Sequence, residues 1–201
     1  MIAIVDYGLG NVQAIANNYK RLNIAASLAA TDDALRRADR IVLPGVGSFD
    51  WAMQSLARSG LRESLDELVM IERRPVLGIC VGMQMMARSS EEGDEAGLGW
   101  IDAEVKRFPA APGLMLPHMG WNDVRSRGQS ALMKGLDRDA RFYFLHSYYF
   151  APLTDEVVIA TSEYGQAFAC AVQVENIFGV QFHPEKSHGW GIQLLKSFAE
   201  I

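Results

Sequence analysis

The chain has 201 residues, and its 19 lysines and arginines against 24 aspartates and glutamates give a net charge of −5. Hydrophobic residues make up 49% of the sequence, which is ordinary for a globular protein and sufficient for a substantial core. The acidic balance and the lack of a basic cluster argue against binding to nucleic acid or to an anionic membrane through bulk charge. We expect a single domain over residues 1–201.

Neither a membrane span nor a secretory signal is expected. The longest nearly uncharged stretch, residues 75–87, is shorter than the roughly 20 apolar residues that a spanning helix needs. The opening residues MIAIVDYG lack the basic start and long apolar segment of a signal peptide and are typical of a buried strand. We therefore expect a cytoplasmic protein. Two cysteines, Cys80 and Cys170, are too few for a disulfide framework.

The first half of the chain alternates apolar runs with helical patterns. These patterns predict strands at 2–5, 24–28, 41–43 and 75–79, and helices at 12–22, 51–56 and 61–71, with a short helix capped by Thr31. Such alternation is typical of parallel strands joined by covering helices, because a right-handed crossover returns the chain to the same sheet. The first half therefore predicts an α/β fold.

Beyond Gly97 shorter apolar runs follow one another. They predict strands at 102–108, 122–126, 142–150, 157–162, 168–174 and 179–182, which would form a mixed or antiparallel portion. A closing helix is expected where Ile192, Leu195 and Phe198 share one face. The predicted fold class is thus α/β, with an open, mixed, largely parallel sheet flanked by helices.

The stretch PVLGICVGMQ, residues 75–84, has the form of a nucleophile elbow centred on Cys80. Gly78 and Gly82 permit a sharp strand-to-helix turn that lifts the cysteine side chain clear of the sheet, and the helix N-terminus favours a thiolate. A buried cysteine between two packing glycines is the alternative that this motif alone leaves open. Cys170, in the apolar segment AFACAV, is expected to be a buried structural thiol.

A histidine and a glutamate two residues apart follow an apolar run near the other end of the chain. In the segment GVQFHPE, His183 would exchange a proton with the thiol, while Glu185 would hold the far ring nitrogen. A surface loop whose two side chains merely face solvent is the alternative for this short motif alone. Together the two motifs predict a triad of Cys80, His183 and Glu185.

The segment LPGVG, residues 43–47, lies at the carboxyl end of the strand before the elbow, where ligands gather in open α/β sheets. Backbone N–H groups of Val46, Gly47 and Val81 are therefore predicted to form an oxyanion hole for a tetrahedral intermediate. An ordinary strand-terminating turn is the alternative for this segment alone.

The three motifs in this order closely resemble those of the class I glutamine amidotransferases, which implies a flavodoxin-like fold and a Cys-His-Glu triad. Within that class, Asp6-Tyr7-Gly8, PGVGSF, PHMGWN and HPEK resemble segments of the glutaminase subunits of imidazole glycerol phosphate synthases. The resemblance implies that L-glutamine is hydrolysed here. It also implies that the ammonia passes to a separate cyclase subunit, which is built as a (β/α)8 barrel and acts in histidine biosynthesis.

The resemblance also implies roles for further residues. Gln84 and Glu92 should help to hold the glutamine, and backbone groups of Ser147 and Tyr148 should bind its α-amino acid end. Positions that face the cyclase or the ammonia passage are matched by Asn11, Met119, Trp121, Tyr143 and Lys186. Core positions for Met119 and Trp121, and a solvated surface position for Glu92, are the alternatives.

Three other functions stay open at this point. One is a glutaminase that serves another synthase, of the pyridoxal phosphate or anthranilate type, although PHMGWN and HPEK weigh against it. The second is an elbow-type cysteine peptidase, which needs no partner. The third is a silent interaction subunit, for which Cys80→Ser would leave function intact. No metal is expected, because the other histidines are not grouped with cysteines or carboxylates at metal-ligand spacing. No cofactor is expected either: Gly8-Leu9-Gly10 follows a strand, but Gln13 stands at the third glycine position of the dinucleotide-binding fingerprint.

Overall fold

The computed structural model describes residues 1–136 and 139–201. The N-terminal half alternates strands and helices as predicted, with ends that differ by a few residues. Its strands are β1 (Ile2–Val5), β2 (Ala26–Ala29), β3 (Arg40–Gly45) and β4 (Val76–Cys80). Its helices are α1 (Val12–Arg21), α2 (Asp32–Arg36), α3 (Phe49–Ser59), α4 (Arg62–Asp66) and, directly after β4, the short α5 (Val81–Gln84).

The rest of the chain is built mainly from short strands. They are β5 (Ser89–Ser90), β6 (Ala103–Arg107), β7 (His118–Asp123), β8 (Arg125–Ser126), β9 (Arg141–His146), β10 (Tyr148–Pro152), β11 (Val158–Glu163), β12 (Ala167–Val174) and β13 (Ile177–Val180). Helix α6 (His188–Glu200) closes the chain as predicted. Single 3-10 turns occur at Ala131–Met133, Asp155–Val157 and Pro184–Lys186.

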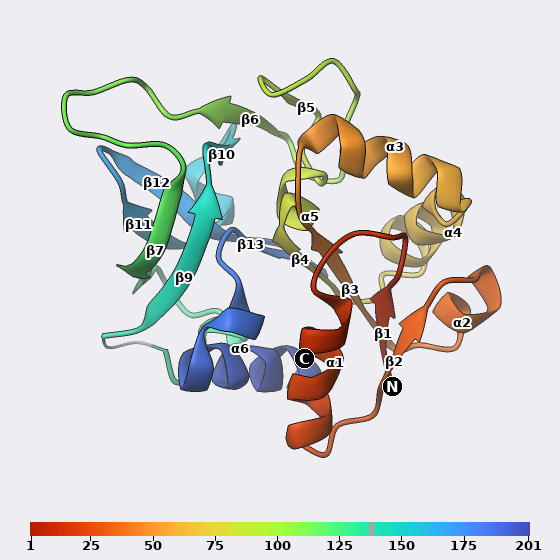
Figure 1. The fold of residues 1–201 in the computed structure, drawn as a ribbon. Helices are drawn as coiled ribbons and strands as arrows, with labels where there is room; N and C mark the ends of the chain where they lie inside the picture. The colour runs from red at the N-terminus through yellow and green to blue at the C-terminus, as the bar shows by residue number, and fades with distance from the viewer. Residues whose placement is uncertain (137–138) are drawn as a thin grey trace.

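The main sheet has the strand order β2-β1-β3-β4-β13-β12-β10-β6-β5, and β11 and β8 extend it from β12. Strands β1 to β4 and β13 are parallel to one another, whereas β12 and β10 pair antiparallel. Strands β7 and β9 form a separate antiparallel pair. In Figure 1 the parallel strands stand on the right and the antiparallel ones on the left, with β13 between them.

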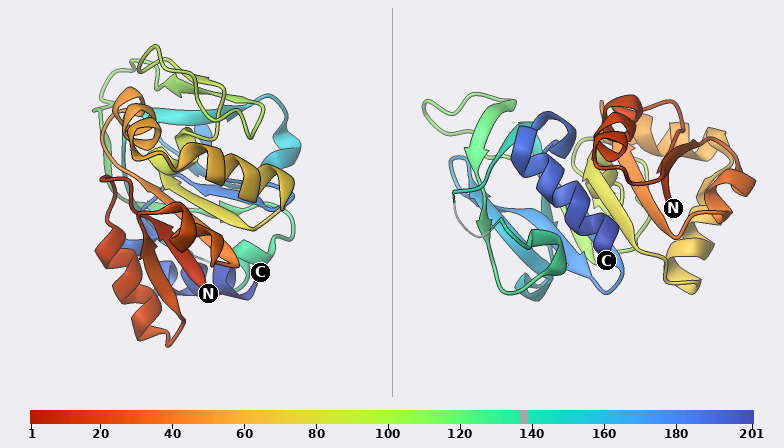
Figure 2. Two further views of the ribbon diagram at one scale, coloured as in Figure 1. Left: turned by 90° about the vertical axis from the view of Figure 1, so that its right-hand side faces the viewer. Right: turned by 90° about the horizontal axis from the view of Figure 1, so that it is seen from below.

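Helices cover both faces of the parallel part. Figures 1 and 2 show α1 and α6 together on one face, and α3 and α4 on the other. Each of β1, β4 and β13 is buried along its whole length, which is typical of a parallel sheet that is covered on both sides. The predicted open, mixed, largely parallel sheet with flanking helices is confirmed. Within the described residues, no helix has the length and apolar character needed to span a membrane.

Several predicted elements differ in detail. The run predicted as one strand over 142–150 is two strands with Ser147 between them. The sequence does not show this break, because aromatic residues continue through both strands. The helix predicted over 61–71 ends in a π-helical turn, Glu67–Ile71. The strand predicted over 179–182 lies two residues earlier, and β5 is not among the predicted strands.

Strand β7 is the largest of these differences, because the prediction of 122–126 misses its first four residues. Its burial pattern is inverted: His118 is buried, whereas the apolar Met119 and Trp121 are exposed. A search for apolar residues that alternate toward the core therefore fails over 118–121. Strand β7 thus presents large apolar side chains to the surface instead of to the core.

Candidate active site

The three predicted motifs leave the sheet at one edge. In the parallel register Gly45 of β3 pairs with Cys80 of β4, and Val180 of β13 pairs with Ile79. The carboxyl ends of these neighbouring strands therefore deliver residues 46–47, 80–82 and 181–185 to the same place. This edge is where open α/β sheets bind their ligands.

Cys80 sits at a sharp turn between β4 and α5. Its backbone has φ 55° and ψ −113°, a conformation that is costly for a residue other than glycine. The turn packs tightly against β3: a Cβ atom on Gly82 would lie 2.0 Å from the Leu43 carbonyl oxygen, and one on Gly45 would lie 2.3 Å from the Gly82 nitrogen. Both glycines are required for this close approach, and the predicted elbow geometry is present.

The structure brings Cys80, His183 and Glu185 together in one row. The His183 Nδ1 atom lies 2.8 Å from Glu185 Oε1, and Cys80, at the end of the neighbouring strand, is close enough to His183 to raise the pKa of its imidazole. The side chains of His183 and Glu185 are only 3% and 2% exposed. The backbone N–H of His183 donates to the Tyr143 carbonyl oxygen (2.9 Å), which fixes the segment against β9.

Charge and hydrogen bonding favour the ionised forms of His183 and Glu185. Burial lowers the pKa of His183, but its hydrogen bonds and charge interactions with Cys80 and Glu185 outweigh burial and raise the pKa to about 10. Burial raises the pKa of Glu185, but hydrogen bonds from His183 and from Asn11 outweigh it and leave the pKa lowered. The Asn11 Nδ2 atom donates to Glu185 Oε1 over 2.8 Å. The row can therefore hold an imidazolium next to a carboxylate.

The predicted oxyanion donors lie beside the nucleophile. Val46 and Val81 each follow directly on the paired residues Gly45 and Cys80, so their peptide groups are neighbours at the sheet edge. Val81 begins α5, where backbone N–H groups lack partners within the helix. Gly47 has φ 86°, a backbone conformation that favours glycine. Their role in binding an oxyanion stays a prediction.

Two of the residues predicted to hold glutamine contact each other next to the elbow. Gln84 Nε2 donates to the Tyr148 carbonyl oxygen over 3.1 Å, and Gln84 is 2% exposed. Ser147 lies between β9 and β10, where its carbonyl oxygen accepts from the Phe108 N–H (3.2 Å). Because Gln84 belongs to the helix that follows Cys80, its contact with Tyr148 brings the connection between β9 and β10 to the elbow.

Glu92 occupies a different position. Its carboxylate accepts the backbone N–H of Phe49, the first residue of α3, over 2.8 Å. The carboxylate is half-buried, and this burial raises its pKa, although the bond from Phe49 opposes the shift. The alternative of a solvated surface position is therefore wrong, because Glu92 is tied to the segment that follows the predicted oxyanion residues.

The residues predicted to face a partner differ in their exposure and contacts. Met119 and Trp121 are 61% and 40% exposed, so the alternative of core positions for them is wrong. The Lys186 Nζ atom lies 5.6 Å from the centre of the Tyr143 ring. Asn11, which is predicted for the same surface, directs its amide inward to Glu185.

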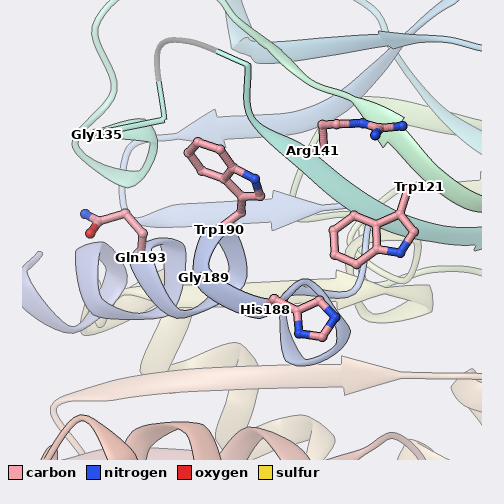
Figure 3. A pocket seen from close by; sticks show the side chains of 7 residues that line it. All are labelled: Trp121, Gly135, Arg141, His188, Gly189, Trp190 and Gln193. Carbon is pink, nitrogen blue, oxygen red and sulfur yellow. The ribbon is translucent and has the colours of Figure 1, made fainter.

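A separate cavity of about 590 Å³ lies next to Trp121. Figure 3 shows that its walls come from β7, β9 and α6, and that the indole of Trp121 lies beside the His188 ring. The two rings are stacked, with centroids 5.4 Å apart and an interplanar angle of 6°. The lining residues are Trp121, Gly135, Arg141, His188, Gly189, Trp190 and Gln193. No triad residue lines this cavity, so it adjoins the predicted partner surface and not the nucleophile.

Sequence reasoning misses two features of the site. It assigns no role to Gln181 within GVQFHPE, yet the Nε2 atom of Gln181 lies 3.7 Å from the Cys80 sulfur. It considers His118 and His146 only as metal ligands and does not pair them, yet His118 Nδ1 lies 2.9 Å from His146 Nε2. The signal for Gln181 is a lone amide at the end of an apolar strand, whereas the histidine pair depends on a strand register that no local pattern reveals. Within residues 1–136 and 139–201, the structure contains no cluster of three or more potential metal ligands.

Comparison with known proteins defines the class. The family described as "Glutamine amidotransferase class-I" matches residues 3–200. Similar solved structures include a glutamine amidotransferase, with a TM-score of 0.77 and 19% identity, covering 100% of this chain and 99% of that one. Another is PurLQS from Thermotoga maritima, with a TM-score of 0.73, 18% identity and coverage of 99% and 97%. At these identities the solved structures show the fold alone. The class I glutamine amidotransferase family is shown by the family match over residues 3–200.

Curated relatives narrow the class. Imidazole glycerol phosphate synthase subunit HisH of Bdellovibrio bacteriovorus is 56% identical, and subunit HisH of Leptospira interrogans is 50% identical. Subunit HisH 2 of Pseudomonas aeruginosa is 45% identical, and all three alignments cover 100% of both chains. The chain therefore belongs to the class I glutamine amidotransferase family and, within it, to the HisH subunits of imidazole glycerol phosphate synthase. The resemblance inferred from its motifs is confirmed.

Proposed function

We propose that this protein is the glutaminase subunit of an imidazole glycerol phosphate synthase. It hydrolyses L-glutamine to glutamate and ammonia through a cysteinyl thioester, and the ammonia passes to a partner cyclase in histidine biosynthesis. The observation that carries the chemistry is the buried row of Cys80, His183 and Glu185 at the elbow. Membership of the HisH family supports the choice of acceptor reaction.

In the first half of the proposed reaction, the Cys80 thiolate attacks the side-chain amide carbon of glutamine. The carbonyl oxygen becomes negative and is bound by the backbone N–H groups of Val46, Gly47 and Val81. His183 donates its proton to the departing nitrogen, because an amide carbon expels neutral ammonia far more readily than an amide anion. Ammonia leaves, and a glutamyl thioester remains on the sulfur.

In the second half, water replaces ammonia. His183, now neutral, removes a proton from a water molecule that attacks the thioester carbon. Collapse of the second tetrahedral intermediate releases glutamate and returns the proton to the Cys80–His183 pair. Glu185 stays ionised throughout and holds the imidazole through Nδ1, in agreement with its lowered pKa.

The contacts around Gln84 support its proposed role with the substrate. Both hydrogens of its amide nitrogen are used, one on the Tyr148 carbonyl oxygen (3.1 Å) and one on Gln181 Oε1 (3.0 Å). Its own Oε1 atom is therefore the atom that remains to accept an N–H of glutamine. Ser147 and Tyr148 would supply backbone groups to the α-amino acid end of glutamine. Glu92, which is bonded to the first residue of α3, would help to hold the same substrate.

A partner is part of the proposal. The exposed Met119 and Trp121, with Tyr143 and Lys186 beside them, form a surface of large side chains. This surface adjoins the triad, since Lys186 directly follows Glu185 in the chain. Exposed apolar side chains that gather at one place mark interaction sites in soluble proteins. We assign this surface to the cyclase, a (β/α)8 barrel. Ammonia released into neutral water is mostly protonated, and a covered passage would keep it nucleophilic.

The direct test is an assay of glutamate release by the purified protein, alone and with the cyclase carrying its nucleotide ligand. We expect low activity alone and a clear rise with the liganded cyclase, together with glutamine-dependent formation of the cyclase product. Cys80→Ala serves as the inactive control. Glutamate release that is absent under both conditions would refute the glutaminase, and release that is equal in both would refute the coupling to the partner.

A further inference from the structure

Gln181 is a buried polar residue that the proposed mechanism does not use. It is 0% exposed and follows directly on β13. Its backbone N–H donates to the Cys170 carbonyl oxygen over 2.9 Å, and its side-chain Nε2 lies 3.7 Å from the Cys80 sulfur. A buried amide needs partners to offset its desolvation, and here one of those partners is the proposed nucleophile.

The orientation of this amide is fixed by its neighbours. The Tyr148 carbonyl oxygen can only accept a hydrogen bond, so the Gln84 atom 3.1 Å away must be the amide nitrogen. The same nitrogen lies 3.0 Å from Gln181, and the atom that faces it must therefore be the acceptor Oε1. The amide nitrogen of Gln181 is then left to point at Cys80. A carbonyl oxygen of the backbone thus determines which end of Gln181 meets the sulfur.

A second branch reaches the same carbonyl oxygen. His146 Nδ1 lies 2.7 Å from the Tyr148 oxygen and must donate to it, so its Nε2 accepts from His118 Nδ1 over 2.9 Å. Asn122 Nδ2 then donates to His118 Nε2 (3.1 Å) and to the Glu163 carbonyl oxygen (2.8 Å). Burial lowers the pKa of His118 to about 4 and that of His146 to about 3, so both rings are neutral.

The hydrogen bonds of these amides and imidazoles therefore end on two backbone oxygens, which can only accept. Asn122 donates to the Glu163 carbonyl oxygen, and Gln84 and His146 both donate to the Tyr148 carbonyl oxygen. Reversing any single amide or imidazole would place two donors or two acceptors face to face, which is costly in a buried setting. The direction of the Gln181 amide is consequently not free to change on its own.

We propose that Gln181 is a positioning residue that acts through Cys80, by donating an N–H to the sulfur and holding it between the amide and the His183 ring. The proposal deepens the proposed function and rests on it. A hydrogen bond to the charged form of a group stabilises that form, so the amide would favour the thiolate over the thiol. It would also restrict the sulfur to the side that faces the imidazole.

The test measures the reactivity of the thiol without substrate. The rate of Cys80 alkylation by iodoacetamide is recorded against pH for the wild type and for Gln181→Met, which has a similar volume but no N–H donor. The labelled peptide is identified by mass spectrometry. We expect the pH midpoint of alkylation to rise by about one unit, and alkylation at pH 7 to slow by roughly tenfold, the loss of one hydrogen bond to a charged group. With the cyclase present, kcat should fall much more than KM changes.

Gln173→Met is the matched control. Gln173 is a partly buried glutamine of the same sheet, whose side chain accepts from Ser130 Oγ (2.7 Å) instead of contacting a thiol. The same chemical change there should leave the alkylation profile of Cys80 as it is in the wild type. An unchanged profile in Gln181→Met, or an equal shift in the control, would overturn the proposal.

A second variant covers the case in which Gln181→Met does not fold. Gln84→Met leaves Gln181 in place but removes the group that orients it, and its alkylation midpoint should shift in the same direction by a smaller amount. Because alkylation is measured without glutamine, the role of Gln84 in substrate binding does not enter. A midpoint equal to that of the wild type would overturn the proposal. A wild type that alkylates normally but releases no glutamate would instead refute the proposed function.

Discussion

The two cysteines lie on neighbouring regions of one sheet and differ in everything except burial. Cys80 ends β4 and Cys170 lies inside β12, with β13 between the two strands. Cys170 is 0% exposed, and this burial raises the pKa of its thiol, so it stays protonated. Cys80 is nearly as buried, at 3%, but it lies at a turn and has His183 and Gln181 as polar neighbours.

This contrast shows where the chemistry of a buried thiol comes from. Inside a strand, the backbone is committed to its neighbours and the side chain meets apolar packing, so burial alone acts and opposes ionisation. At the end of a strand, the positive φ of Cys80 turns the side chain toward groups delivered by the next strand. The sheet edge, and not the residue type, makes one sulfur a candidate nucleophile.

The largest expected effect comes from replacing each of the two cysteines by alanine. Cys80→Ala should lower kcat in the liganded complex by roughly 10⁴-fold or more, the loss found when a nucleophile is removed from a triad enzyme. Cys170→Ala should leave kcat within about twofold and cost roughly 1 kcal/mol in the free energy of unfolding, because it only removes a buried sulfur. Glutamate release and urea denaturation measure the two effects. Equal losses of activity in both variants would contradict the contrast.

The second prediction concerns the carboxylate behind the imidazole. Glu185→Gln keeps the shape of the side chain but removes the charge that favours the imidazolium, so kcat should fall by roughly 10²- to 10⁴-fold. The loss should appear mainly in kcat, and the pH dependence of kcat/KM should change with it. The exposed Glu156 offers the control, and Glu156→Gln should behave as the wild type. A Glu185→Gln enzyme with wild-type kcat would remove Glu185 from the triad.

The third prediction tests the turn that distinguishes Cys80 from Cys170. In Gly82→Ala the new methyl group would lie 2.0 Å from the Leu43 carbonyl oxygen, and a backbone oxygen cannot yield as a flexible side chain can. We expect a loss of about 2–3 kcal/mol in the free energy of unfolding, as for an overpacked core, and a loss of activity with it. Gly189→Ala is the control, since a Cβ atom there meets nothing within 4 Å. Equal stability of the two variants would show that the elbow relaxes.

Much of the fold is predictable because its signals are local. Each strand of the parallel half is a short apolar run and each main helix repeats apolar residues every three to four positions, so β1, β3, β4, α1 and α3 are all predictable. The triad is predictable for the same reason, since Cys80 and His183 each sit in a short motif with a chemical meaning.

What the sequence does not reveal depends on which strands become neighbours. His118 meets His146 only because β7 and β9 pair in the register that places the two residues opposite each other. Gln181 reaches Cys80 because β13 lies beside β4, and Gln84 reaches Tyr148 because α5 turns back over β10. Such contacts join residues far apart in the chain and leave no periodicity behind. These contacts also decide the direction of the hydrogen bonds around Cys80.

The last prediction extends the contrast to the imidazoles. Burial lowers the pKa of His118 and His146 to about 4 and about 3, from an ordinary value of 6.5, whereas Cys80 and Glu185 together raise that of His183 to about 10. Between pH 4 and 6.5 the unfolded chain therefore binds protons at His118 and His146 that the folded chain excludes, and the free energy of unfolding falls as the pH falls. The contribution of His183 has the opposite sign, because it is complete below pH 6.5 and is lost as the pH rises toward 10.

Urea denaturation at a series of pH values separates these contributions. Each of the two buried rings should add a slope of up to about 1.4 kcal/mol per pH unit on the acid side, so roughly 2 kcal/mol per ring, or about 4 kcal/mol for the two, should be lost between pH 6.5 and 4.5. In His146→Gln the slope should become shallower whatever the change in stability at neutral pH, because a glutamine takes up no proton. His188→Gln, at an exposed position, should keep the wild-type slope. A slope that is the same in His146→Gln and in the wild type would mean that the buried pair accepts a proton without loss, and the neutral state inferred for these two rings would then be wrong.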